Sequence, residues 1–228
     1  MDAFRDTLPS VTEAPAAAPR PMTEAQSLTH RPRWSPIWRP MMLFVPLVLT
    51  LVLVNGVVGG LSVWEWIGLP MAGLFLWTLL EYLIHAFAFH PRPLSGWLKE
   101  VQASHAMHHA YPKRPEYIVA RYRFTVPVAV LIFLLLWLLV GDWQRASLIL
   151  VGTMIGYLAY EAVHWSIHRR WAVRFLPRRL VLHHLHHHFK DDQRCYGVTT
   201  PLWDYVFGTG PKPSRVERPS SKADEAVR

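Results

Sequence analysis

Histidine is the residue type that stands out in this chain of 228 residues, which contains 13 of them. One, His30, lies alone near the N-terminus. The others form four short groups: His85 and His90; His105, His108 and His109; His164 and His168; and His183, His184, His186, His187 and His188. Neutral imidazole is a good ligand for iron, copper, zinc and nickel. The four groups therefore predict a metal site, provided that the fold brings them together.

The spacing within the groups supports convergence. His164 and His168 are four residues apart, on one face of a helix. The group at 105, 108 and 109 has i, i+3 and i+4 spacing, so we expect each of these two sets to aim its rings at a common point. His85 and His90 are five apart, about 140° around an ideal helix. Both reach one site only if the helix ends or bends near Phe89, and Pro91 predicts such an end.

The last run contains two triplets that fit one helix face: His183, His186 and His187, or His184, His187 and His188. Helix geometry alone does not choose between them. The separation from His85 to His105 and that from His164 to His184 are both 20 residues, which favours the second triplet. Ten ligands result, enough for two ions with about five each. A pair of iron ions can activate O2 for attack on a C–H bond, whereas zinc has no redox chemistry.

Carboxylates precede two of the groups by about one helical turn, Glu81 before His85 and Glu161 before His164. Such groups can accept the second ring N–H of a ligating histidine and fix its tautomer. We therefore expect Glu81, Glu161 and also His183 to surround the ligands. No side chain beyond the metal ligands is expected to act in catalysis, and Cys195, the single cysteine, is expected to be an ordinary thiol.

Four apolar segments must position these histidines, in a chain that is 51% hydrophobic. Residues 40–64 contain no charge and exceed the roughly 20 residues that a membrane-spanning helix needs. A second segment runs from Trp66 to about Phe89, after a turn that includes Gly59, Gly60 and Glu65. The third covers 124–141, and after the turn GDWQR the fourth runs from 146 to 160 and beyond. The predicted fold is an all-α integral membrane protein with four transmembrane helices in two hairpins and a cytoplasmic His-rich helical cap.

The charges predict the orientation of these helices. The chain has 24 Lys and Arg and a net charge of +8, yet Arg145 is the only basic residue in the two short turns at 60–66 and 141–145. Because basic residues mark the cytoplasmic face, we expect both termini and the metal site on that side of a bacterial inner membrane or the endoplasmic reticulum. Basic residues that flank spans suit anionic lipid, so no nucleic-acid partner is expected. Six basic residues are expected near the site, where they would attract a lipid headgroup or an acidic electron carrier: Lys113, Arg114, Arg169, Arg170, Arg178 and Arg179.

Composition along the chain predicts three parts. Residues 1–40 are rich in Pro and Ala and lack an apolar period, so we expect a flexible cytoplasmic tail. Residues 41–209 form the four-helix membrane domain with its di-metal site, and residues 210–228 form a flexible C-terminal tail.

Four sequence boxes resemble those of the fatty acid hydroxylase / sterol desaturase superfamily of membrane di-metal oxygenases. They are EYLIHAFAFH, SHAMHHAYP, YEAVHWSIH and LHHLHHHF followed by YGVTTPLWDYVFGT, and the resemblance spans Leu79 to Thr209. The first box and the ending YGVTTPLWD are most similar to those of fatty acid 2-hydroxylases. Matched onto the last box, the resemblance implies that His184, His187 and His188 are ligands and His186 is the variable position.

The resemblance also implies the reaction and its helpers. It implies two iron ions, O2 and an external electron donor, and hydroxylation of the carbon next to the carbonyl of an acyl chain in a membrane lipid or acyl thioester. Zinc competes for nitrogen sites, so a purified sample could hold zinc. Ala86 stands where relatives often have a basic residue. Many relatives carry a fused cytochrome b5 domain; because residues 1–40 and 210–228 do not suit one, we expect a separate donor such as a cytochrome b5 or a ferredoxin.

The sequence is also compatible with two alternatives. The same chemistry could give a desaturase, or a hydroxylase of a sterol, carotenoid or other lipid. A His-rich zinc or nickel transporter is the more remote alternative, because transporters bind ions near the membrane midplane, whereas these histidines are predicted at one face.

Overall fold

The computed structural model describes residues 36–90, 95–170 and 173–212, all of which belong to one compact unit. The expected tails lie outside the described residues apart from 36–40 and 210–212. Within the described ranges the chain forms helices and no strand. The prediction of an all-α fold is therefore confirmed.

Four segments of the described chain are long and apolar enough to cross a membrane, as predicted. They contain α2 (Trp38–Val58), α3 (Val63–Leu83) with its π-helical continuation η1 (Ile84–Phe89), α6 (Tyr122–Val140) and α7 (Trp143–Arg169). The shorter elements are α4 (Gly96–Ala110), α5 (Pro115–Ile118), the 3-10 turn η2 (Val173–Phe175), α8 (Arg178–Phe189) and α9 (Leu202–Val206).

The turn before α3 is shorter than the sequence suggested. Gly59 ends α2 with a φ of 71°, and Ser62 caps α3 by accepting from the backbone N–H of Glu65. The Glu65 carboxylate accepts in return from the backbone N–H of Ser62 at 2.8 Å, which completes a capping box. The sequence predicts Glu65 in the connection, but the structure places it in the first turn of α3.

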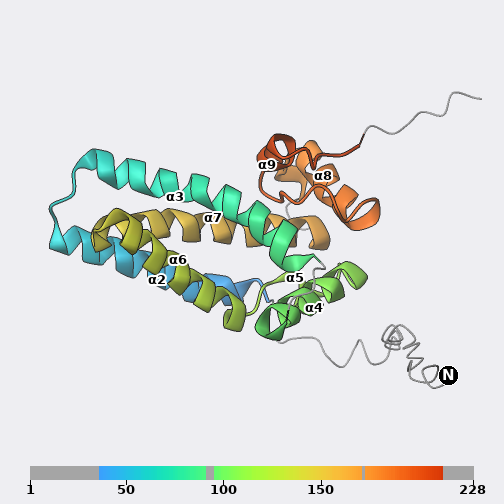
Figure 1. The fold of residues 1–228 in the computed structure, drawn as a ribbon, viewed down its shortest axis with the longest axis horizontal. Coiled ribbons are helices and arrows are strands. Elements are labelled where there is room, and N and C mark those ends of the chain that lie inside the picture. The colour runs from blue at the N-terminus through green and yellow to red at the C-terminus, as the bar shows by residue number, and fades with distance from the viewer. Residues whose placement is uncertain (1–35, 91–94, 171–172, 213–228) are drawn as a thin grey trace, which may run out of the picture. The chain divides into compact units, whose positions relative to one another are not determined.

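Helix α7 is the centre of the membrane-spanning part. It packs against α3 most extensively, and also against α2 and α6. Figure 1 shows α3 on one side of α7 and α2 and α6 on the other, with the two short connections at one end of the long helices and α4, α8 and α9 at the other. Because α2 and α3 each pack mainly on α7, their pairing as an independent hairpin stays a prediction.

Close backbone contact joins α3 to α7. A Cβ atom at Gly73 would overlap the carbonyl oxygen of Ile149, and one at Gly152 would overlap the carbonyl oxygen of Pro70. Small residues allow such an approach between helices in a membrane, where packing rather than the hydrophobic effect holds helices together. The α3–α7 contact thus fixes the positions of the histidines near the ends of both helices.

Candidate metal centre

All ten histidines predicted as ligands come together at the end of the bundle that carries α4, α8 and α9. They form two groups, and within each the available ring nitrogens lie within 4.8 Å of one another. We call these groups site A and site B. Site A contains His85, His90, His105, His109 and His187, and site B contains His108, His164, His168, His184 and His188.

The Nε2 atoms make the closest approaches. In site A, those of His90 and His187 are 3.1 Å apart and those of His105 and His109 are 3.0 Å apart. In site B the corresponding pairs are His108 and His164 at 2.9 Å, His168 and His184 at 2.8 Å, and His108 and His188 at 3.1 Å. Each set therefore surrounds a small common volume.

The π-helical segment explains how His85 and His90 reach the same site. An α-helix separates residues five apart, but a π-helix has i→i+5 hydrogen bonds and brings such residues onto one face. Segment η1 covers 84–89, and His90 follows with extended backbone at φ −85° and ψ 151°. The ring centroids of His85 and His90 are 5.3 Å apart. The expected bend near Phe89 is thus a change of helix type followed by a helix end.

Helices α4 and α8 each supply both sites, which corrects one expectation. We expected the histidines of α4 to aim at a common point, but His105 and His109 belong to site A and His108 to site B. Adjacent residues on a helix point about 100° apart, so a helix that lies between two sites serves both. On α8, His187 belongs to site A, whereas its neighbour His188 belongs to site B.

Two backbone carbonyls fix ring tautomers in site A. The Nδ1 atom of His85 donates to the Tyr196 carbonyl oxygen at 2.6 Å, and that of His187 donates to the Arg194 carbonyl oxygen at 2.7 Å. Because a carbonyl oxygen only accepts, each Nε2 carries a lone pair directed into site A. The Nε2 atom of His85 is buried and has no hydrogen-bond partner within the described structure. An unsatisfied buried acceptor of this kind fits a metal ion.

Burial keeps these imidazoles in the form that binds metal. Loss of solvation lowers the pKa of His90 to about 4 and that of His187 to about 3. It also lowers the pKa of His105, His108 and His184 well below the usual value. Neutral imidazoles therefore predominate at neutral pH, and their donor set suits iron or zinc.

The carboxylates near the sites have other partners than expected. Glu81 accepts from the backbone N–H groups of Val198 and Thr199 and from the Thr199 hydroxyl. Glu161 accepts from the Tyr157 hydroxyl at 2.9 Å and from the backbone N–H of Ala120 at 3.2 Å. Among the described residues neither accepts from an imidazole, so the expected carboxylate–histidine contacts are wrong. These carboxylates hold neighbouring backbone segments instead.

His183 and His186 belong to neither site. His183 is buried, and its Nε2 donates to the Asp204 carboxylate at 2.9 Å, whereas His186 is half-exposed. The assembled triplet of α8 is thus His184, His187 and His188, which the matched spacing favoured. Cys195 is fully buried, and burial raises the pKa of its thiol to about 12, so it stays protonated.

The basic residues expected near the site remain mostly at the surface. Lys113, Arg169, Arg170, Arg178 and Arg179 are exposed, while Arg114 is half-buried, with Glu116 at 3.5 Å. Arg169 donates to the Lys113 carbonyl oxygen at 3.0 Å, which joins the end of α7 to the segment after α4.

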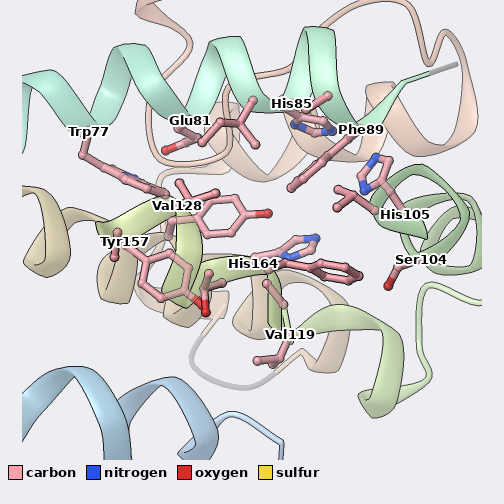
Figure 2. Close-up of a pocket in the computed structure, with 18 of the residues that line it drawn as sticks. Trp77, Glu81, His85, Phe89, Ser104, His105, Val119, Val128, Tyr157 and His164 are labelled. Carbon is pink, nitrogen blue, oxygen red and sulfur yellow. The ribbon is translucent and has the colours of Figure 1, made fainter. Parts of the chain in front are cut away.

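An apolar cavity of about 210 Å³ leads from the histidines into the membrane-spanning helices. Its walls come mainly from α3, α4, α6 and α7. His85, His105 and His164 lie toward one end, and Trp77 and Tyr157 lie at the other (Figure 2). Apolar side chains of α6 and α7 form much of the wall between them. No separate sequence pattern predicts this cavity, because most of its lining residues are ordinary members of apolar helices.

Comparison with known proteins agrees with this geometry. The sequence model of the fatty acid hydroxylase family matches residues 70–209. A dihydroceramide fatty acyl 2-hydroxylase of Arabidopsis thaliana is 29% identical over 178 residues, which cover 76% of this chain and 73% of that protein. The human fatty acid 2-hydroxylase is 34% identical over 149 residues, 62% of this chain and 39% of that protein.

A solved structure is also similar. It is described as full-length scs7p with only the hydroxylase domain visible, and it superposes with a TM-score of 0.67 at 27% identity, over 78% of this chain and 67% of that one. The ceramide very long chain fatty acid hydroxylase SCS7 of Saccharomyces cerevisiae is 34% identical over 60% of this chain. The match spans 36% of that yeast protein and less than half of the human enzyme, but nearly three quarters of the plant one.

Proposed function

This chain belongs to the fatty acid hydroxylase family, and we propose that it is a membrane-bound, O2-dependent hydroxylase that acts at carbon 2 of a fatty acyl chain in a membrane lipid or acyl thioester. One observation carries the proposal: two sets of five imidazoles, seven of them buried and three half-buried, lie at the end of an apolar cavity between membrane-spanning helices. Relatives named as fatty acyl 2-hydroxylases support the position of attack.

Sites A and B would each hold one iron ion through the Nε2 atoms of their five histidines. Bound iron would supply the redox chemistry that imidazole lacks, namely O2 activation with electrons from a donor. Three helices and η1 with His90 hold the ten rings around these two small volumes. Because zinc binds the same donor set, a purified sample could contain zinc in place of iron.

The cavity would select and orient the substrate. Because the wall of the cavity is apolar, an acyl chain would pass into it from the lipid without contact with water. Exclusion of water would also protect the reacting carbon from side reactions. The carboxyl end would lie near His85, His105 and His164, because only that end of the cavity adjoins the metal sites and the polar cap. Carbon 2 would then be the first methylene group to reach the metal sites.

The charge distribution supports a cytoplasmic position for the sites and for both termini. Electrons would come from a separate protein such as a cytochrome b5 or a ferredoxin, which could approach the exposed basic residues at the ends of α7 and α8. In this proposal residues 41–209 form the hydroxylase domain.

Lipid mass spectrometry of cells that express the protein tests the proposal. We expect acyl chains heavier by one oxygen atom, with the hydroxyl group at carbon 2. His108→Ala should abolish them, because His108 Nε2 contacts two other ligands of site B. His186→Ala is the matched control, since His186 belongs to neither site, and it should retain the product.

The competing functions give different results. A desaturase would yield chains lighter by two hydrogen atoms, and an enzyme that acts on a sterol or carotenoid would leave simple acyl chains unchanged. A metal transporter would consume no more O2 than iron and the reductant consume without protein. Any of these results would refute acyl 2-hydroxylation.

A further inference from the structure

Asp204, on the short helix α9, is fully buried, and none of the hydrogen bonds of its carboxylate comes from a ligand of site A. Its carboxylate accepts four hydrogen bonds. Oδ1 accepts from the backbone N–H of Tyr196 at 2.9 Å and from the Thr209 hydroxyl at 2.8 Å. Oδ2 accepts from the backbone N–H of Gly197 at 2.8 Å and from His183 Nε2 at 2.9 Å. A buried carboxylate with every partner in place gives a rigid hub.

The hub holds the two carbonyls that orient the rings of site A. Tyr196, whose N–H donates to Asp204, accepts from His85 through its own carbonyl oxygen. The adjacent backbone is tied in the same way: Cys195 N–H donates to the Thr209 carbonyl oxygen at 2.9 Å, and Thr209 N–H donates to the Asp204 carbonyl oxygen at 2.7 Å. The segment that includes Arg194 and Tyr196 is therefore fixed against residues 204–210.

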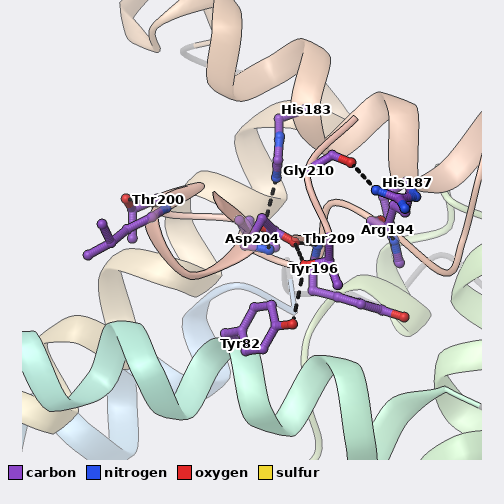
Figure 3. A network of polar contacts seen from close by, with 12 residues as sticks. Tyr82, His183, His187, Arg194, Tyr196, Thr200, Asp204, Thr209 and Gly210 are labelled. Atoms are coloured by element: carbon purple, nitrogen blue, oxygen red, sulfur yellow. Dashed lines mark hydrogen bonds and ion pairs between the residues drawn. The ribbon is translucent and has the colours of Figure 1, made fainter. Parts of the chain in front are cut away.

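Arg194 closes the same network from the other side. Its guanidinium donates to the carbonyl oxygens of Gly208 at 3.1 Å and Gly210 at 2.6 Å, while its own carbonyl oxygen accepts from His187. Figure 3 shows His183 pointing to Asp204 from α8, and Tyr82 of α3 reaching Thr209. His183 lies one turn before His187, so its bond to Asp204 also ties the turn of α8 that leads to this ligand to the 194–197 segment.

Site B has no equivalent network among the described residues. The Nδ1 atoms of its ligands His108, His184 and His188 are buried without a hydrogen-bond partner. The rings of site B are thus oriented by their helices and by packing, whereas two rings of site A depend on one loop and on the carboxylate that organises it.

We propose that Asp204, with His183, is a positioning residue for site A alone: it holds the 194–197 backbone whose carbonyl oxygens set the orientation of His85 and His187. The proposal rests on metal binding by the two sites, as proposed above. Groups that orient metal ligands typically change metal affinity by about 10–100-fold when they are replaced. Loss of the hub should therefore weaken one of the two sites by that factor and leave the other unchanged.

Co2+ titration of the full chain, purified in detergent and stripped of metal, tests this, with the visible absorption of bound Co2+ and a competing chelator as the readout. The wild type should bind two equivalents. Asp204→Asn has one acceptor oxygen in place of two, so whichever way the amide turns, two of the four donors face an NH2 group. We expect one equivalent to bind about 10–100-fold more weakly and the second with wild-type affinity and spectrum.

Two further variants separate positioning from general damage to the fold. His183→Phe removes one of the four bonds and should weaken the same equivalent to a smaller extent, whereas His183→Gln keeps a donor and should restore it. Asp192→Asn is the control for the loss of a negative charge, since Asp192 is exposed in the same loop. This variant should bind both equivalents of Co2+ with wild-type affinity. If Asp204→Asn does not fold, the comparison of His183→Phe with His183→Gln tests the inference instead.

Each outcome discriminates. Equal weakening of both equivalents, or a lower melting temperature with both affinities unchanged, would mean that Asp204 serves only the fold, and the inference would be wrong. A wild type that binds fewer than two equivalents would instead refute the proposed pair of metal sites itself.

Discussion

The apolar cavity makes a quantitative prediction at Val128. This residue lies on α6 and lines the cavity between the histidines at one end and Trp77 and Tyr157 at the other (Figure 2). Replacement by Phe inserts a bulky ring into a volume of about 210 Å³. An acyl chain that passes Val128 must then lose part of its contact with the wall, whereas a chain that ends before Val128 does not.

The size of the effect follows from the apolar area lost. If the added ring displaces about three methylene groups of the substrate, at about 0.8 kcal/mol each, binding loses about 2.4 kcal/mol. At about 1.4 kcal/mol per factor of ten, this lowers kcat/KM about 50-fold for long chains. Short chains should react at close to the wild-type rate, so the preference shifts toward them.

The assay measures kcat/KM over a homologous series of acyl lengths for Val128→Phe and for Val130→Phe. Val130 lies two residues along α6 and is 52% exposed on the outer surface of the bundle, so the same substitution there should change none of the rates. An equal loss at every length for Val128→Phe, or no loss for long chains, would refute the assignment of this cavity to the acyl chain.

Three further predictions follow from packing and protonation. Gly73→Leu should lower both the melting temperature in detergent and the metal content, because any side chain there overlaps the backbone of α7. Gly68→Leu is the control and should lower neither, since a side chain at that position meets open space. Equal effects of the two substitutions would contradict the close contact between α3 and α7. The metal-free protein should lose stability as the pH falls below about 6.5. In that range the histidines of the unfolded chain bind protons, whereas His90 and His187 in the folded protein, with pKa values of about 4 and 3, stay neutral. A melting temperature that stays constant from neutral pH to about pH 4 would contradict this prediction. Cys195 should resist alkylation at mildly alkaline pH in the folded protein and react after denaturation, since it is buried and its pKa is raised to about 12; rapid labelling of the native state would show that the segment opens.

The sequence alone predicted the ten histidines that the structure gathers and the helices that carry them. It could do so because both signals are local. A membrane-spanning helix is visible as a long uncharged segment, and histidines three or four residues apart share a helix face wherever that helix lies. The matched separations even favoured the triplet of α8 that is assembled, although local spacing could not exclude the alternative that contains His183.

Only the tertiary structure decided how the ligands divide and what supports them. Adjacent histidines on α4 and α8 belong to different sites because those helices lie between the two sites. The spacing of residues along the sequence does not say where a helix lies relative to the other helices. The partners of Glu81 lie 117 and 118 residues away along the chain, so its position one turn before His85 suggested the wrong contact. Asp204 stands 119 residues after His85, and it reaches that ring only through the backbone of Tyr196. Such long-range contacts exist only after α3, α8 and the 194–210 segment have packed together.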